Sequence, residues 1–279
     1  SSTMQSVFMV VNDEMLTPKQ IKQFKQRNTE NSLTLEHHID NALPKSAWFN
    51  LFYSLPSIYQ DGLEKQQAIP LLFQLIEKRN LATSYTLIDN KNDHDSFDEP
   101  LTYGFENLFS TQSKLNNISS LVFADKLNNI PTGLHLFYFA DSSSYQFELF
   151  INALLLAQQQ KELKDIIWVS SIGNKVKDTR LSTKPALLIS SSGSSENLNA
   201  SAEVNKLTSH MDLQSTLMTN WLDCSVNNTS YSNGDDIIPL TKDRVIANTS
   251  AEGMIVFNKD KSVLIDQNGN FQSYSSQLA

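Results

Sequence analysis

Short, continuous apolar runs recur along the first two thirds of the chain and are rich in β-branched and aromatic residues. Runs of this kind are typical of strands that are buried on both faces of a sheet. The sequence therefore predicts strands at residues 6–11, 82–88, 120–125, 134–140, 165–171 and 184–193.

Helical patterns lie between these runs. Residues 68–80 and 143–163 carry apolar side chains at helical spacing. A further helix is predicted from Pro18, because Thr17 is a good N-cap and Gln20 completes a capping box. Strands that alternate with helices predict an α/β fold, with a mostly parallel central sheet and helices on both of its faces.

The last third of the chain begins with one more predicted helix, over residues 210–224. Ser209 could cap this helix, and Asp212 in its first turn suits the N-terminal end of the helix dipole.

Short strands and tight turns follow over residues 244–276, where Asn268-Gly269 is a strong hairpin signal. We therefore expect an α/β domain at residues 1–240 and a small antiparallel meander at residues 241–279 that packs on it.

Composition excludes several classes of function. The chain has 22 basic and 30 acidic residues, a net charge of −8, which argues against a surface that follows nucleic-acid phosphates. Its single cysteine, Cys224, excludes an internal disulfide and a cysteine metal cluster. No run approaches the ~20 apolar residues of a membrane helix. The chain opens on Ser1 with a strand almost at once, as expected of a segment cut from a longer protein.

Three segments carry a resemblance to a known family. They are "FNLFYSLPSIYQDGL" (49–63), "LTSHMDLQSTLMTNWLDCSVNNTSYSNGDDI" (207–237) and "SVLIDQNGNFQSYS" (262–275). The second is the most specific, because it resembles the pattern L-T-x-H-x-D-L-x-x-T-L-M followed by Y-S-x-G-x-D. The chain thus resembles the alkaline phosphatase/sulfatase superfamily, and within it the YejM/PbgA group of Gram-negative inner-membrane proteins.

The resemblance implies a place in the cell as well as a fold. Members of the group have an N-terminal transmembrane region, absent from this chain, followed by a sulfatase-like domain. We therefore expect a domain at the periplasmic face of the inner membrane, with a role in envelope lipid or lipopolysaccharide homeostasis. The implied partners are anionic lipid or lipopolysaccharide and inner-membrane regulatory proteins.

The family's hydrolases use one or two metal ions to hold the ester and to activate a Thr, Ser or modified Cys nucleophile. The resemblance assigns the acidic ligand after the first strand to Asp13, with Glu14 as an alternative. The nucleophile position falls on Pro44, and the Asp-His metal pair after a late strand falls on Ile172 and Gly173. Three positions that carry the chemistry therefore have no suitable side chain.

Other residues nearby could replace the missing groups. Ser46 is either a displaced nucleophile or the cap of a helix that fills a core, and we expect the cap. His37 or His38 could coordinate a metal with Asp13 or Asp40. Adjacent residues of an extended segment point in opposite directions, so one histidine at most would reach a site. We take His38 as the candidate ligand.

Two more stretches have chemistry-bearing side chains. His210 and Asp212 belong to the resembling motif and start a predicted helix, which favours a structural role. Residues 89–99 are acidic enough to suggest calcium but lack the glycine and terminal glutamate of an EF-hand loop, so a solvated loop is expected.

Three hypotheses remain open. The favoured one is a catalytically degenerate sulfatase-like domain, without a cofactor, that binds or regulates. The second is a sulfuric or phosphoric ester hydrolase that uses Mn, Zn or Ca in a rearranged site built from Asp13, Ser46 and one of the histidines. The third is a structural domain that interacts with other proteins.

Overall fold

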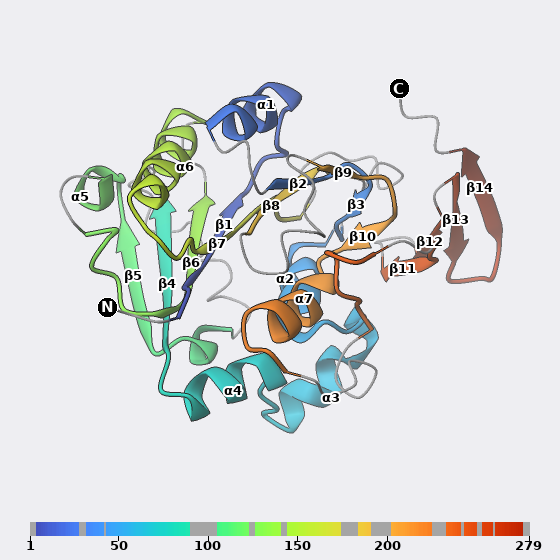
Figure 1. Ribbon diagram of the computed structural model, residues 1–279. Helices are drawn as coiled ribbons and strands as arrows, with labels where there is room; N and C mark the ends of the chain where they lie inside the picture. Colours follow the sequence, from blue (N-terminus) through green and yellow to red (C-terminus); the bar gives the residue numbers. More distant parts are fainter. Residues whose placement is uncertain are drawn as a thin grey trace. The chain divides into compact units, whose positions relative to one another are not determined.

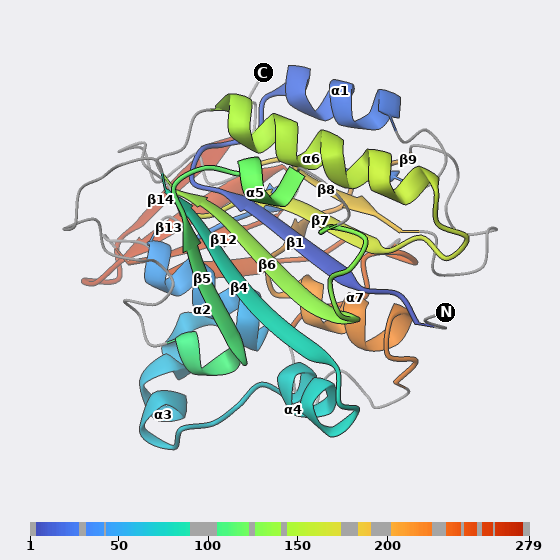
Figure 2. The same cartoon turned by 90° about the vertical axis from the view of Figure 1, so that its left-hand side faces the viewer.

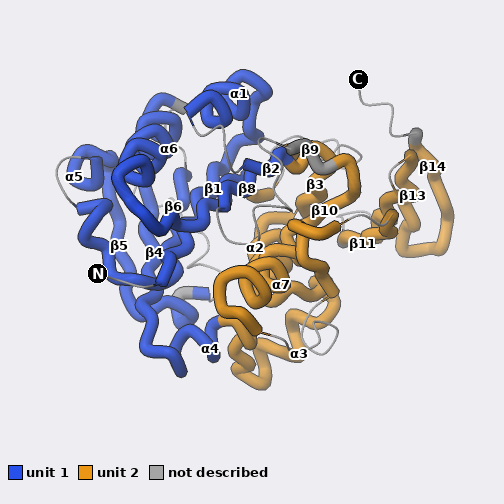
Figure 3. Tube along the Cα trace, in the orientation of Figure 1, with its two compact units in different colours: residues 1–34, 73–171, 186–202 blue, residues 35–72, 172–185, 203–279 orange. Residues whose placement is uncertain are grey.

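The structure is a computed structural model (Figure 1). It describes residues 4–27, 32–41, 43–89, 105–122, 126–140, 144–173, 184–190, 202–224, 233–240, 243–249, 253–258 and 260–275. The predicted acidic loop at 89–99 lies almost wholly outside these residues. The chain divides into two compact units (Figure 3). Unit 1 comprises residues 1–34, 73–171 and 186–202, and unit 2 comprises residues 35–72, 172–185 and 203–279.

Unit 1 is built on the large sheet, whose eight strands have the order β5-β4-β6-β1-β7-β8-β2-β9. Neighbours from β5 to β7 are parallel, and β8 is antiparallel to β7. The predicted α/β fold with a mostly parallel sheet is therefore confirmed. The strands are β1 (Val7–Asn12), β2 (Ser32–Leu35), β4 (Ala82–Asp89), β5 (Thr111–Leu115), β6 (Gly133–Ala140), β7 (Ile166–Ser171), β8 (Ala186–Ile189) and β9 (Ala202–Val204).

Three helices of unit 1 lie over the same face of this sheet (Figure 2): α1 (Pro18–Arg27), α5 (Ser119–Val122) and α6 (Ser144–Gln159). The short 3-10 helix η3 covers Glu106–Leu108. The predicted capping box of α1 is confirmed, since the Gln20 amide donates to Thr17 Oγ1 at 3.1 Å and the Thr17 amide donates to Gln20 Oε1 at 3.0 Å. Aromatic side chains of β6 and α6 meet in the apolar core below these helices.

One predicted strand of the large sheet is wrong, and three of its strands, β2, β5 and β9, were missed. The strand expected at 120–125 begins inside helix α5. Two side chains start this helix: Asn117 accepts the Ser119 amide and Gln146 accepts the Ile118 amide. Strand β5 was missed because its sequence TQSKL is polar and mostly exposed, so it lacks the apolar run of a central strand.

Unit 2 contains two parallel two-residue strands, β3 (His38–Ile39) and β10 (Thr208–Ser209). Its helices are α2 (Pro44–Tyr53), the 3-10 helix η1 (Ser57–Tyr59), α3 (Gln60–Lys65) and α7 (Asp212–Asn220). Helix α4 (Leu71–Lys78) crosses the division between the units. Within the described ranges, no helix of either unit has the length and apolar character needed to cross a membrane.

The predicted C-terminal meander is confirmed as an antiparallel sheet of order β11-β12-β13-β14. Its strands are β11 (Ile246–Thr249), β12 (Gly253–Phe257), β13 (Lys261–Asp266) and β14 (Phe271–Ser275). The hairpin turn lies at Asn268-Gly269, as predicted, and Gly269 has φ 81°. The sheet packs through Ile255 and Leu264 on Ile39 and Met211 of the same unit. The predicted boundary between residues 240 and 241 stays a prediction.

Candidate functional site

The nucleophile position of the resembling family falls at the start of helix α2. Pro44 is the first helical residue, and its N-cap is Leu43, whose side chain makes no capping hydrogen bond. Ser46 therefore lies inside the first turn, and the prediction that it caps the helix is wrong. The prediction that the helix fills a core is correct, because Trp48 and Phe52 are fully buried and their rings stack.

Pro44 lies against the residue that takes the place of the family's metal-binding histidine. A Cβ atom built on Gly173 would be 3.0 Å from Pro44 Cγ, which is closer than ordinary van der Waals contact. Gly173 also has φ 69°, a left-handed conformation that side chains disfavour. Ile172 beside it is buried. The family's nucleophile position and its histidine position are therefore occupied by a proline ring and a glycine backbone that lie close together.

A buried polar chain lies nearby in unit 2 and includes the predicted ligand His38. His38 Nδ1 is 2.9 Å from Thr208 Oγ1, and His38 Nε2 is 2.9 Å from His210 Nδ1. His210 Nε2 is 3.0 Å from Asp40 Oδ1, and Lys184 Nζ is 3.3 Å from Asp40 Oδ2. All five side chains belong to residues that are almost completely buried.

The carboxylate of Asp40 fixes one proton position in this chain. His210 Nε2 faces this carboxylate, which only accepts, so the nitrogen carries a proton. Which atom donates between His38 and His210, and between His38 and Thr208, depends on the tautomers of the rings. Burial holds the pKa of His38 well below its ordinary value of 6.5, and the charges of His210 and Arg244 lower it further. Both nitrogens of His38 are thus used by protein partners.

A second buried ionic group surrounds the start of helix α7. Arg244 donates to both carboxylate oxygens of Asp212 at 2.7 Å, and its Nε is 3.3 Å from Asp235. Asp212 also accepts the backbone amides of Ser209 and Asp235 at 2.8 Å. The expected Ser209 cap is wrong, because the N-cap is Met211. Instead Asp212 holds the residues before and around the helix, which supports its predicted structural role.

The predicted site residues fall into both units. Asp13 follows β1 in unit 1, where its amide donates to the Phe139 carbonyl at 3.1 Å, whereas Ser46 and His38 belong to unit 2. Their assigned roles stay predictions. The structure brings His38 together with His210 and Asp40, as the sequence allowed.

Two charged residues of these clusters were missed. Lys184 was read as the start of a strand, and Arg244 as the start of the meander. Neither has a local partner, since Asp40 and Asp212 lie far away in the sequence, so periodicity gives no signal for them.

Of the residues at the family's nucleophile and metal positions, only Asp13 offers a side-chain donor, and the other three do not fit a metal ion. Pro44, Ile172 and Gly173 offer no side-chain donor, and His38 already uses both ring nitrogens. Among the residues that the structure describes, no group of three or more His, Cys, Asp or Glu side chains is placed to hold one.

Comparison with known proteins defines the class of fold. No protein-family profile matches the chain, and no curated protein matches it. Solved structures do match it and share its fold, which agrees with the sulfatase-like fold expected from the sequence.

Three similar structures illustrate this. The lipoteichoic acid synthase LtaP from Listeria monocytogenes has a TM-score of 0.62 at 11% identity, covering 99% of this chain and 87% of that chain. The zinc complex of the C-terminal periplasmic domain of EcEptC from Escherichia coli has a TM-score of 0.61 at 10% identity, covering 93% of each chain. The PsFucS1 sulfatase from Pseudoalteromonas sp. has a TM-score of 0.59 at 10% identity, covering 99% and 82%. At identities this low, structural similarity supports a shared fold but says nothing of a shared activity.

Proposed function

We propose that this chain is a catalytically degenerate sulfatase-like domain that binds or regulates rather than hydrolyses esters. The observation that carries the proposal is that Pro44 and Gly173 take these positions, so close together that a Cβ atom on Gly173 would be 3.0 Å from Pro44 Cγ. A hydrolase of this fold needs a nucleophile and metal ligands at these positions, because the metal supplies the positive charge that stabilises the transition state. Here a proline ring and a glycine backbone pack against each other instead.

The buried polar chain supports the same proposal. A histidine that binds a metal must turn an unprotonated nitrogen toward the ion. His38 turns one nitrogen to Thr208 and the other to His210, and His210 turns its second nitrogen to Asp40. Recruiting His38 would break at least one buried hydrogen bond, which costs about 1–3 kcal/mol for each polar group left without a partner.

We place the domain at the periplasmic face of the inner membrane, with a role in envelope lipid or lipopolysaccharide homeostasis. The support is the likeness of three segments to the YejM/PbgA group, together with the fold shared with a periplasmic domain. Inner-membrane regulatory proteins are the partners that suit the chain best. Its net charge of −8 opposes direct adsorption to an anionic lipid surface.

The first test is calorimetric titration of the chelator-treated domain with Mn²⁺, Zn²⁺ and Ca²⁺. The expected result is no stoichiometric binding at micromolar affinity. A one-to-one isotherm that Asp13→Ala abolishes would overturn the proposal and favour the hydrolase with a rearranged site. A matched control is Asp260→Asn, which changes one exposed carboxylate in the meander and should leave any isotherm unchanged.

The second test measures hydrolysis of p-nitrophenyl sulfate, p-nitrophenyl phosphate and bis-p-nitrophenyl phosphate with each metal present. We expect rates at the level of buffer alone. Turnover that Ser46→Ala removes, with the folded fraction unchanged by circular dichroism, would show that Ser46 is a displaced nucleophile and would refute the degenerate reading.

A further inference from the structure

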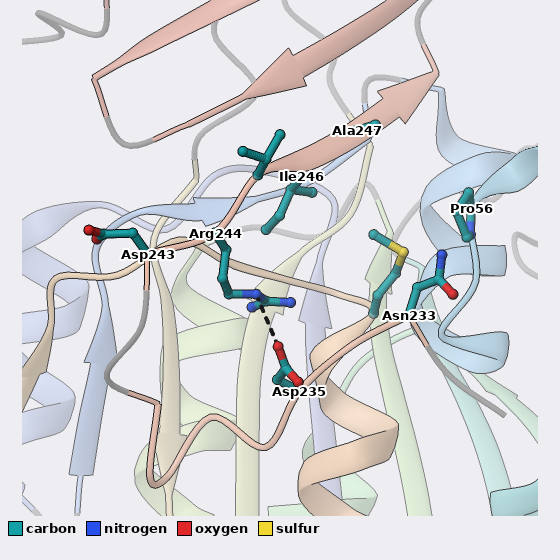
Figure 4. Close-up of a pocket in the computed structure, with 9 residues that line it drawn as sticks. Pro56, Asn233, Asp235, Asp243, Arg244, Ile246 and Ala247 are labelled. Carbon is teal, nitrogen blue, oxygen red and sulfur yellow. Dashed lines mark ion pairs between the residues drawn. The ribbon is translucent and has the colours of Figure 1, made fainter. Parts of the chain in front are cut away.

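The charged side chains around the cavity of unit 2 bind one another. This cavity of about 460 Å³ lies beside β11, and Arg244 points toward Asp235 in it (Figure 4). The Arg244 guanidinium also binds Asp212 and the Leu207 carbonyl. The cavity therefore belongs to the buried ionic group described above, and its chemistry identifies no ligand.

Helix α6 of unit 1 has apolar side chains on its outward side as well as on the side that faces the sheet. Of its 16 residues only Glu148 is charged, and Glu148 accepts a hydrogen bond from Gln20 Nε2 at 3.2 Å. Outward side chains are nevertheless apolar: Tyr145 is 68% exposed, Leu149 36% and Leu156 61%. A helix that is apolar all round is normally buried. The outward side of α6 therefore has the character of a surface that another element covers.

The outward side chains of α6 follow the spacing of paired helices. Tyr145, Leu149, Asn152 and Leu156 are separated by intervals of four, three and four residues, and we call these four residues the α6 stripe. The same intervals form the heptad pattern, in which side chains of one helix pack between those of another. The α6 stripe thus has the pattern of a surface that receives a second helix.

Asn152, in the middle of the α6 stripe, favours the same occupant. Among the described residues its side-chain oxygen has no hydrogen-bond partner, although it is shielded from solvent. A polar atom in this state costs free energy, which a donor on a packed helix would recover. A single asparagine in a helix-pairing surface also selects the partner and the register. Lipid tails offer no donor, so a bilayer would leave this oxygen without a partner.

Helix α1, which lies alongside α6 (Figure 2), carries positive charge. It contains four basic residues and no acidic residue. Lys19, Lys22 and Arg27 are exposed, and among the described residues no carboxylate forms an ion pair with any of the three. The chain as a whole has a charge of −8, but charges more than about 8 Å away are largely screened at physiological salt. A helix on the α6 stripe would therefore meet cations along the edge that faces α1.

A second copy of the chain fits this surface poorly. Helices α1 and α5 flank α6 on opposite sides, since Gln20 bonds Glu148 and the Ile118 amide bonds Gln146. In a two-fold antiparallel pair of α6 helices, both α1 helices lie on the same side and their cations would meet. A parallel pair would place α1 beside the α5 helix of the other copy, whose sequence SSLV carries no charge. Neither arrangement pairs the cations of α1.

We propose that the α6 stripe binds an amphipathic helix of a partner protein. The partner helix has apolar residues at heptad spacing against α6, and aspartate or glutamate along the edge that faces α1. Its apolar side supplies affinity, and its acidic edge sets the orientation. The inference concerns residues other than those at the family's nucleophile and metal positions, and it holds whether or not the chain hydrolyses esters.

The test is a selection from a phage library of single helices, in which the apolar and flanking positions vary and the whole chain is the bait. Clones that also bind Leu156→Gln are removed. We expect enrichment of apolar residues at heptad spacing and of acidic residues on one edge. A selected peptide, measured by fluorescence anisotropy, should lose about tenfold or more in affinity on Leu149→Gln. The control Phe271→Gln changes a side chain that is 71% exposed on β14 and should alter affinity less than about twofold.

Reversal of charge on both partners tests the acidic edge. Lys22→Glu should weaken the selected peptide about threefold or more, and a peptide with lysine in place of its acidic residues should bind Lys22→Glu better than the parent chain. The matched control is Lys261→Glu, which reverses an exposed cation on β13 and should change the affinity of either peptide less than about twofold.

The proposal is overturned by a selection that enriches no heptad pattern or no acidic residues, or by equal effects of Lys22→Glu and Lys261→Glu. Two further results would overturn it by identifying another occupant. A dimer in sedimentation that Leu156→Gln dissociates would indicate a second copy of the chain. Binding to vesicles of phosphatidylcholine and phosphatidylglycerol that Leu156→Gln abolishes would indicate a lipid surface.

Discussion

The two units differ in the polarity of the side chains that they bury. Unit 1 has an apolar centre of aromatic rings from β6 and α6, in which the ring centroids of Phe147 and Phe150 lie 5.6 Å and 5.5 Å from that of Phe139. Unit 2 also has apolar packing, but it buries ion pairs as well, and their carboxylates on Asp40 and Asp212 are 1% and 0% exposed. An apolar centre tolerates exchange of side chains of similar volume, whereas a buried ionic network depends on every partner. The difference predicts that the units respond differently to substitution and to pH.

The largest effect is expected at Asp212. Asp212→Ala leaves Arg244 buried without its bidentate partner and removes the acceptor of two backbone amides. Breaking a buried ion pair from one side costs about 3–5 kcal/mol, so urea denaturation should show a loss of that size. The double variant Asp212→Leu, Arg244→Met should recover part of it, because the buried guanidinium is removed together with its buried partner, and the other carboxylate that pairs with it, Asp235, is partly exposed. A double variant less stable than Asp212→Ala would contradict this account.

Gly173→His restores the residue type that the family places there and should also destabilise the chain. The new Cβ would meet Pro44 Cγ at 3.0 Å, and the backbone is in the left-handed region, so the expected cost is about 1–3 kcal/mol. Gly269→His is the matched control, since Gly269 has φ 81° and nothing within 4 Å of an added Cβ. The difference between the two variants measures the contact with Pro44. Equal losses would show that this contact is not tight.

The same contrast explains which parts of the fold were predictable. In unit 1, apolar runs and helical spacing follow from local sequence, so β1, β4, β6, β7 and α6 were predicted close to their bounds. Strand β5 escaped because an edge strand need not be apolar. In unit 2, local patterns gave α2, α7 and the meander.

The contacts of the candidate site depend on distant pairs. His38 and His210 are 172 positions apart, and Asp212 and Arg244 are 32 apart. No periodicity relates such residues. The sequence therefore identified His38, Asp40 and His210 as polar candidates, and only the fold shows that they bind one another.

The third prediction compares the two units through their histidines. The pKa of His38 is well below 6.5, mainly through burial, and burial also lowers that of His135 in unit 1. In the unfolded chain each of these histidines binds a proton near pH 6.5, whereas in the folded chain it stays unprotonated. The free energy of unfolding therefore falls as pH drops below that value. Each such group contributes about 1.4 kcal/mol per pH unit until its folded pKa is reached.

Urea denaturation between pH 7.5 and about 4.5 measures this. His38→Gln should flatten the pH dependence over a wider range than His135→Gln, because the pKa of His38 is the more strongly lowered. If His135→Gln flattened it more, the ionic centre of unit 2 would not be the acid-sensitive part of the molecule.

The smallest effect on stability is expected where an ion pair lies at the surface. Lys206 and Asp243 are 2.9 Å apart, but their side chains are 30% and 78% exposed, so Lys206→Met should change the free energy of unfolding by less than about 1 kcal/mol. Lys261→Met, which removes an exposed cation from β13, is the control for the change of net charge. A loss well above about 1 kcal/mol in Lys206→Met alone would mean that this ion pair contributes more to stability than an exposed pair does.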